Sequence, residues 1–111
     1  MSDLNRVIHK REGQFFERKG CFDRSKGKVK LRSIRDVAKD LAETLAAMAN
    51  ADGGTIVIGI EDDGAVSGAN YPEERLKVLR EAPQTHIRPA ILSSIRTAQL
   101  EGKTILVFET D

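Results

Sequence analysis

The sequence predicts an α/β domain, and three segments carry that prediction. Residues 34–49 repeat apolar side chains at helical spacing, residues 55–60 form an apolar run of strand length, and residues 90–110 have the pattern of a hairpin. A helix with one apolar face needs a surface to bury it against, and a strand without a polar face needs cover on both sides. The 111 residues suffice for one core of this kind.

The start of the chain has the weakest patterns. Residues 1–11 look like a short amphipathic lead-in, with apolar residues at helical spacing. Residues 14–19, QFFERK, predict a strand, because aromatic residues favour a pleated surface. A basic loop follows, interrupted by Gly20 and Gly27.

The helix predicted after this loop is the clearest element. Ser33 fits an N-cap, and Asp36 lies near the positive end of the helix. Asn50 and residues 52–54, Asp-Gly-Gly, are expected to end the helix, because Asn and Gly tolerate the left-handed conformation. The apolar face is formed by residues at steps of three, four and seven: Ile34, Val37, Ala38, Leu41, Leu45, Met48 and Ala49.

Residues 55–60, TIVIGI, predict a strand in the middle of a covered sheet, since five of the six residues are β-branched and both faces are apolar. Gly59 is unusual there, because glycine weakens a strand unless a backbone or a ligand passes close by. Residues 61–64, EDDG, predict a turn, and residues 65–68, AVSG, predict a short returning strand.

A second helix is predicted over residues 72–82, with Pro72 just inside its start and Glu73 and Glu74 in its positive first turn. Pro83 and Pro89 are expected to bound a loop.

A closing hairpin then completes the predicted fold. It combines residues 90–100, a turn at 101–103 and residues 104–110. A domain rarely stops at the end of an apolar strand, so we expect the natural chain to continue beyond Asp111.

The charge of the chain is unevenly distributed. Its net charge is +1, but residues 18–35 hold eight Lys and Arg against one acid, Asp23, whereas residues 51–111 hold six bases against ten acids. A nucleic-acid surface on one side of a domain has this distribution. The alternative is a basic loop that is simply solvated.

Several function classes find no support in the sequence. No apolar run approaches the roughly 20 residues of a membrane helix, the amino terminus has no apolar signal-peptide core, and one cysteine, Cys21, excludes an internal disulfide. We therefore expect a cytosolic setting. Residues 102–104, GKT, precede a strand and lack the earlier glycine of a phosphate loop. His9 and His86 have no ligand spacing beside them.

Carboxylates flank two of the predicted strands. Glu12 and Glu17 flank the first, and Glu61 begins the acidic run after the central one. If the two strands are neighbours, these acids converge at one sheet edge, where carboxylates can bind Mg²⁺ or Mn²⁺ and offset charge on a scissile phosphate. Alternatively, Asp62 and Asp63 are turn residues and the glutamates are exposed strand-end charges.

Three segments together resemble a known family. They are residues 12–19, EGQFFERK, residues 45–68, LAAMANADGGTIVIGIEDDGAVSG, and residues 86–91, HIRPAI. This pattern is similar to the Schlafen-type AlbA-like domain, also described as a DNA-binding or divergent AAA-type domain of bacterial transcriptional regulators. The resemblance covers roughly residues 10–110, and the N-x-x-G-G-T-x-x-I-G block is its specific part.

The resemblance implies an α/β (α+β) fold with a mixed sheet and helices packed on it, often dimeric. It implies that residues 1–111 form one nucleic-acid-binding domain at the front of a longer regulator. In the vertebrate Schlafen branch the fold is an endoribonuclease acting on transfer and ribosomal RNA. The metal ligands of that branch correspond to Glu12, Glu17 and Glu61, where Glu61 replaces an aspartate and Arg18 replaces an aromatic residue.

Three interpretations follow. The first is a cytoplasmic nucleic-acid-binding module of a transcriptional regulator that needs no cofactor and binds DNA or RNA. The second is a metal-dependent endoribonuclease that uses Glu12, Glu17 and Glu61 with Mg²⁺ or Mn²⁺. The third is a structural or dimerisation module. The residues expected to contact nucleic acid in the first are Lys19, Arg24, Lys26, Lys28, Lys30, Arg32, Gly53 and Gly54.

Overall fold

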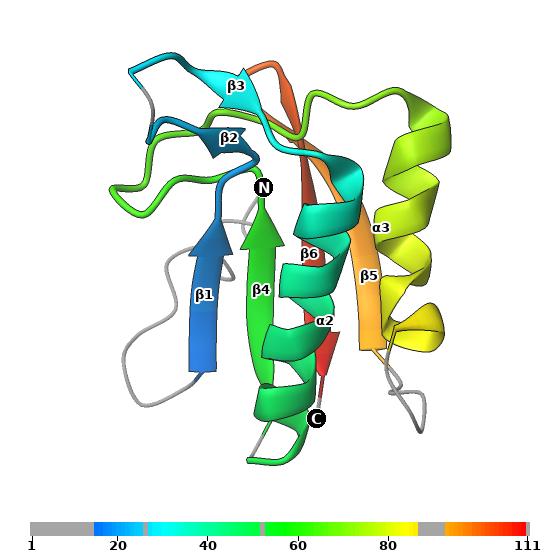
Figure 1. Ribbon diagram of the computed structural model, residues 1–111. Coiled ribbons are helices and arrows are strands. Elements are labelled where there is room, and N and C mark those ends of the chain that lie inside the picture. Colours follow the sequence, from blue (N-terminus) through cyan, green and yellow to red (C-terminus); the bar gives the residue numbers. More distant parts are fainter. Residues whose placement is uncertain (1–14, 26, 52, 87–92, 111) are drawn as a thin grey trace.

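The computed structural model describes residues 15–25, 27–51, 53–86 and 93–110. Within them the chain forms six strands and two helices (Figure 1). In chain order these are β1 (Phe15–Lys19), β2 (Phe22–Asp23), β3 (Lys30–Leu31), α2 (Ile34–Ala49), β4 (Gly54–Ile58), α3 (Glu73–Thr85), β5 (Ser93–Leu100) and β6 (Lys103–Thr110). The predicted lead-in at residues 1–11 lies outside the described residues.

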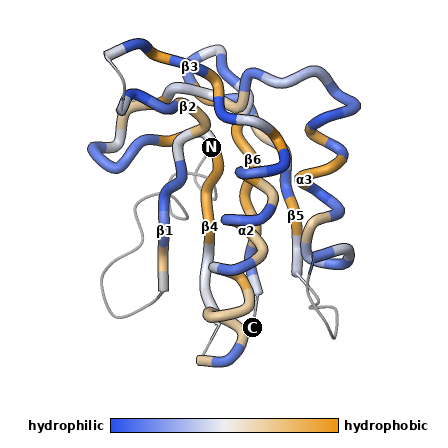
Figure 2. Tube along the Cα trace, in the orientation of Figure 1, coloured by the Kyte–Doolittle hydropathy of each residue, from blue (hydrophilic) through white to orange (hydrophobic). Residues whose placement is uncertain are grey.

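Four strands form one mixed sheet in the order β1-β4-β6-β5. β1 runs parallel to β4, whereas β6 is antiparallel to both β4 and β5. The predicted mixed sheet and the central position of the apolar strand are therefore confirmed. Ile56, Val57 and Ile58 of β4 are completely buried, and Figure 2 shows the hydrophobic run along this strand.

Helix α2 packs over β4 and β6, and α3 lies beside α2 (Figure 1). Ser33 caps α2 as predicted, because its hydroxyl accepts a hydrogen bond from the amide of Asp36 at 3.2 Å. Asn50 ends the helix but keeps a right-handed conformation. Gly53 takes the positive φ of 86° instead, and its amide donates to the carbonyl of Met48 at 2.8 Å.

The basic segment contains a short antiparallel hairpin that the sequence pattern did not predict. In this hairpin Phe22 of β2 pairs with Leu31 of β3, and Asp23 pairs with Lys30. Strands of two residues are too short to show a periodic pattern. The hairpin lies where β1 ends, at the same end of the sheet as the loop after β4 (Figure 1).

The loop after β4 explains the glycine inside the predicted strand. Gly59 has a φ of 106°, and a β-carbon there would meet the backbone of Gly68 and Ala69 at 3.2 Å. The amides of Ser67 and Gly68 both donate to the Gly59 carbonyl. A returning backbone thus passes close by, as the glycine suggested. The returning strand itself is reduced to one bridge, between Ile60 and Val66.

The second helix differs from its prediction at both ends. Pro72 is the N-cap of α3 and lies just outside the helix rather than inside its start. Pro83 does not begin a loop, because α3 continues through it to Thr85. In the last turn of a helix, proline removes a single N–H donor, and the buried Pro83 ring adds apolar contact in return. The amide of His86 still closes the helix by donating to the carbonyl of Ala82 at 2.9 Å.

Candidate nucleic-acid interface

The β2–β3 hairpin and its turn carry three of the exposed cations of residues 18–35, whereas the exposed Arg35 lies on α2. Lys28 and Lys30 are exposed and form no ion pair with any described residue. Arg24 is 53% exposed, and its Nε lies 3.7 Å from Oε1 of Glu61. Lys26, in the same turn by sequence, lies outside the described residues. This hairpin therefore presents positive charge at one end of the sheet.

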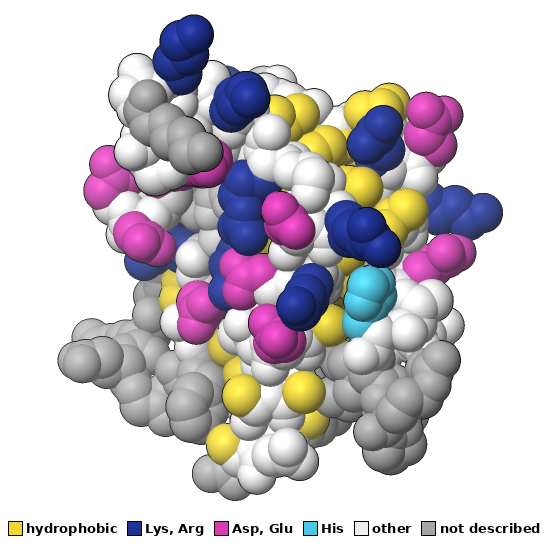
Figure 3. Space-filling view, in the orientation of Figure 1, with side chains coloured by type: hydrophobic (Ala, Val, Ile, Leu, Met, Phe, Trp, Pro, Cys, Tyr) yellow, Lys and Arg dark blue, Asp and Glu magenta, His cyan; other side chains and the backbone are white. Residues whose placement is uncertain are grey.

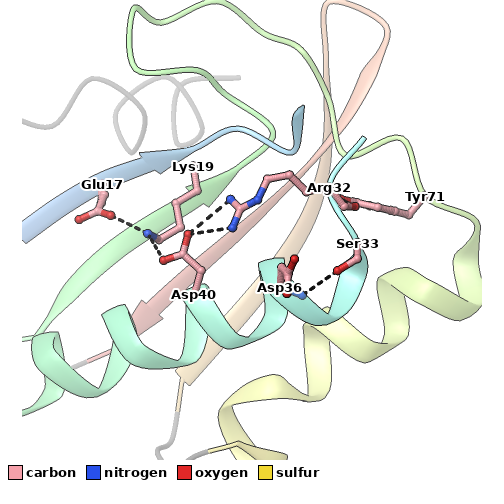
Figure 4. A network of polar contacts seen from close by, with 7 residues as sticks. All are labelled: Glu17, Lys19, Arg32, Ser33, Asp36, Asp40 and Tyr71. Carbon is pink, nitrogen blue, oxygen red and sulfur yellow. Dashed lines mark hydrogen bonds and ion pairs between the residues drawn. The ribbon is translucent and has the colours of Figure 1, made fainter. Parts of the chain in front are cut away.

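Two other predicted phosphate ligands, Lys19 and Arg32, are held by acids (Figure 4). The Nζ of Lys19 lies 2.7 Å from Oε2 of Glu17 and 2.9 Å from Oδ1 of Asp40. The Arg32 guanidinium lies 3.4 Å and 3.5 Å from Oδ2 of the same Asp40. One carboxylate on α2 thus joins β1 to the segment that enters the helix.

This network fixes Lys19 and Arg32 in place. The Lys19 side chain is only 9% exposed. Burial lowers the pKa of Lys19, but its hydrogen bonds to Glu17 and Asp40 and their charges raise that pKa above its ordinary value overall. The Tyr71 hydroxyl donates to the Arg32 carbonyl at 2.7 Å. These contacts give both cations a structural role.

Acidic and basic side chains are interspersed over α2, whereas Lys and Arg project above the β2–β3 hairpin (Figure 3). A mixed surface creates little net field, and exposed pairs of opposite charge are largely screened by salt. The positive end of this face is therefore the hairpin rather than the helix.

Glu61 lies directly beside this hairpin. One carboxylate oxygen, Oε2, accepts a hydrogen bond from the Ser67 hydroxyl at 2.5 Å. The carboxylate also fills the space that a β-carbon at Gly20 would need. These two neighbours hold Glu61 in position, with its side chain 20% exposed.

Two adjoining open hollows meet at Glu61. Their volumes are about 650 Å³ and 380 Å³. Both are lined by Phe22, Arg24, Glu61 and Ala65. Gly20, Asp62 and Asp63 complete the larger hollow, and the smaller one also contains Val29, Val66, Ser67, Asn70 and Lys103.

The described residues do not assemble the predicted metal site. Glu17 bonds to Lys19, whereas Glu61 contacts Ser67, Gly20 and Arg24, so the two glutamates share no partner in this part of the structure. Among the described residues, no three His, Cys, Asp or Glu side chains gather as a ligand set for a metal ion. Glu12 lies outside those residues, so the three-glutamate site stays a prediction.

Gly53 and Gly54 lie away from the hairpin. Gly53 is buried at the end of α2, and Gly54 is the first residue of β4, opposite Phe15 and Thr110. The hairpin lies at the other end of the sheet (Figure 1). These positions explain both glycines, because Gly53 ends α2 and Gly54 starts β4.

Sequence reasoning missed Phe22, Val29, Asn70 and Lys103 as neighbours of Glu61. Phe22 and Val29 could have been found as apolar residues within a strongly basic segment. Asn70 and Lys103 carry no such signal, since only the fold brings the loop after β4 and the β5–β6 turn to the hairpin.

Neither described helix has the length and apolar character that crossing a membrane requires. None of the curated proteins is similar enough to count as a match. Among solved structures, the DIP2311 protein from Corynebacterium diphtheriae matches 98% of this chain at 22% identity with a TM-score of 0.72, which shows a common fold. This chain covers only 25% of that protein.

A second solved structure is the N-terminal domain of a RecG-related protein from Nitrosomonas europaea. It matches 98% of this chain at 26% identity with a TM-score of 0.55, and 68% of its own chain is covered. The family model described as Schlafen, AlbA_2 matches residues 12–111. Because that match spans nearly the whole sequence, the chain belongs to the Schlafen AlbA_2 family.

Proposed function

We propose that this domain binds nucleic acid through the β2–β3 hairpin, as one module of a longer transcriptional regulator. Lys28, Lys30 and Arg24 contact phosphates, together with Lys26 of the same turn. The observation that carries the proposal is the exposure of Lys28 and Lys30 without an ion-pair partner among the described residues. Lys19 and Arg32, in contrast, hold the scaffold.

Two further findings support this assignment. The chain belongs to the Schlafen AlbA_2 family, which is associated with nucleic-acid binding. The Nitrosomonas europaea protein with the similar N-terminal domain has a name that relates it to the DNA helicase RecG. Both are compatible with a domain that brings a larger protein to nucleic acid.

Contacts of this kind supply affinity without reading sequence. Lysine and arginine side chains displace the counterions condensed on phosphates, so binding weakens as salt concentration rises. Phosphate contacts position a protein on the strand, whereas base contacts give specificity. The hairpin alone therefore predicts binding that depends strongly on salt and weakly on sequence.

A salt series measured by fluorescence anisotropy tests the proposal. The test variant carries Lys28→Ala and Lys30→Ala together, and the control Lys77→Ala removes an exposed lysine from α3. The double variant should bind more weakly. The magnitude of its negative slope of log K against log salt should fall by about 2, since each lost phosphate contact reduces that magnitude by about 1. The control should keep the wild-type slope.

Equal slopes for the double variant and Lys77→Ala would contradict the assignment to the hairpin. Failure of the wild-type domain to bind DNA or RNA at low salt would contradict nucleic-acid binding itself. A dimer that forms under those conditions without affinity for either would then support the dimerisation interpretation.

A further inference from the structure

We infer that the smaller hollow beside the β2–β3 hairpin receives an unpaired nucleobase, so that the domain prefers single strands over duplexes. This inference rests on the proposed nucleic-acid binding and adds the form of nucleic acid that is bound. The hollow has a volume of about 380 Å³, which falls within the range of about 300–1,000 Å³ typical of ligand pockets.

One face of the hairpin is apolar. Alternation along paired strands places Phe22 and Leu31 on one face and Asp23 and Lys30 on the other. Val29, which is 59% exposed, lines the hollow together with Phe22. Exposing apolar side chains within a strongly basic segment costs solvation free energy, and a flat apolar ligand would recover it.

The same face offers surfaces on which a base can stack. The guanidinium carbon of Arg24 lies 5.9 Å from the centre of the Phe22 ring. Unpaired bases stack on aromatic rings and on guanidinium planes, and any base can do so because each has a π-face. Phe22 and Arg24 thus provide both kinds of stacking surface at the wall of the hollow.

Four polar side chains also line the hollow, beside Ala65 and Val66. They are Glu61, Ser67, Asn70 and Lys103. Ser67 holds the Glu61 carboxylate, and the Lys103 Nζ donates to the Val66 carbonyl at 3.1 Å. A fixed carboxylate can accept from the exocyclic amine of a base, as Glu and Asp do with cytosine. These groups meet the edge of a base rather than its face.

The charges around the hollow suit a strand rather than a free base. Arg24 and Lys103 lie on its lining, and Lys28 is exposed in the turn of the same hairpin. A phosphate backbone that passes over these cations can direct a base into the hollow. In a duplex the bases stay stacked and paired, so reaching the hollow would first cost unpairing free energy.

Three labelled probes test the inference by fluorescence anisotropy: an oligodeoxyadenylate, the same oligomer with abasic sites throughout, and a duplex of equal length. The wild-type domain should bind the oligodeoxyadenylate about tenfold more tightly than the abasic oligomer, as expected for stacking of one base. It should also prefer the oligodeoxyadenylate to the duplex. Phe22→Ala should remove most of the difference between the first two probes.

Val29→Ser provides a second test. Phe22 is half-buried, whereas Val29 is 59% exposed, so the result does not depend on changing a half-buried side chain. It should lower affinity for the oligodeoxyadenylate by about threefold and leave the abasic oligomer unaffected. The control is Val78→Ser, which changes a valine that is 40% exposed on α3, away from the hollow. This control should bind all three probes as the wild type does.

Equal wild-type affinity for the oligodeoxyadenylate and the abasic oligomer would overturn the base pocket while leaving phosphate binding intact. A base-dependent difference that survives both Phe22→Ala and Val29→Ser would also overturn it, because the base would then bind elsewhere. No binding of any probe at low salt would overturn both this inference and the proposed function.

Discussion

The carboxylate of Glu61 lies against the α-carbon of Gly20, in the space that a β-carbon at position 20 would occupy. Any side chain at position 20 therefore has to move Glu61, which lies in the loop after β4. The contact links the end of β1 to that loop, and Glu61 lines both hollows while Gly20 lines the larger one.

The first prediction is that Gly20→Ala displaces Glu61. The displacement should lower the free energy of unfolding by about 1 kcal/mol, because the hydrogen bond from Ser67 to the carboxylate is lost. In a Glu61→Ala background the same substitution should have almost no effect. A double-mutant cycle measured by urea unfolding checks this, and additive effects of the two substitutions would contradict the contact.

The second prediction concerns Gly59, whose φ of 106° and close neighbours both disfavour a side chain. Gly59→Ala should destabilise the domain by about 1–3 kcal/mol. Gly64→Ala is the matched control, because Gly64 has a φ of 92° and no atom of the described residues within 4 Å of a β-carbon at that position. Urea unfolding should show the smaller loss for Gly64→Ala. Equal losses would mean that backbone conformation alone accounts for the cost.

Much of the scaffold could be predicted from the sequence because its signals are local. The apolar period of residues 34–49 and the Ser33 cap depend on neighbours within two turns of one helix. The apolar run around Ile56 indicated a central strand, and Gly59 indicated a close backbone. Pro83 was misread because local rules say that proline disfavours helix, whereas its burial depends on the fold.

The candidate site was less predictable because it depends on contacts between distant residues. Counting Lys and Arg along residues 18–35 gave a strongly positive segment, but Asp40 lies outside that window and forms ion pairs with both Lys19 and Arg32. Opposite charges far apart in sequence carry no pattern that marks them as partners. The cations on the hairpin were identified from the sequence, whereas the hollow beside them required the fold.

A third prediction follows from the position of Asp40 between two cations. Asp40→Ala should lower the free energy of unfolding by about 1–2 kcal/mol, because among the described residues the nearly buried Lys19 then keeps only Glu17 as an ion-pair partner. Glu73→Ala breaks the exposed ion pair with Arg80 and should have a smaller effect. Urea unfolding of the two variants checks the order. A larger effect of Glu73→Ala would contradict the structural role of Asp40.

The last prediction concerns pH and the completely buried Cys21. Burial raises the pKa of its thiol from 9.0 to about 11, and burial also raises the pKa of Tyr71. Between these two thiol values the unfolded chain has lost the Cys21 proton while the folded domain retains it. The folded state therefore binds more protons, and stability must fall as pH rises through this window.

The contribution of Cys21 is fully present below pH 9 and is lost by about pH 11, which amounts to about 3 kcal/mol. Urea unfolding at pH 7.5 and pH 10.5 measures the loss in the wild type. Cys21→Ala should reduce this loss, although the variant starts from lower stability because it leaves a small cavity. The alkaline loss that remains would come from other groups, including Tyr71 and Lys19, whose pKa values are also raised. An unchanged difference between the two pH values in Cys21→Ala would show that the thiol does not contribute.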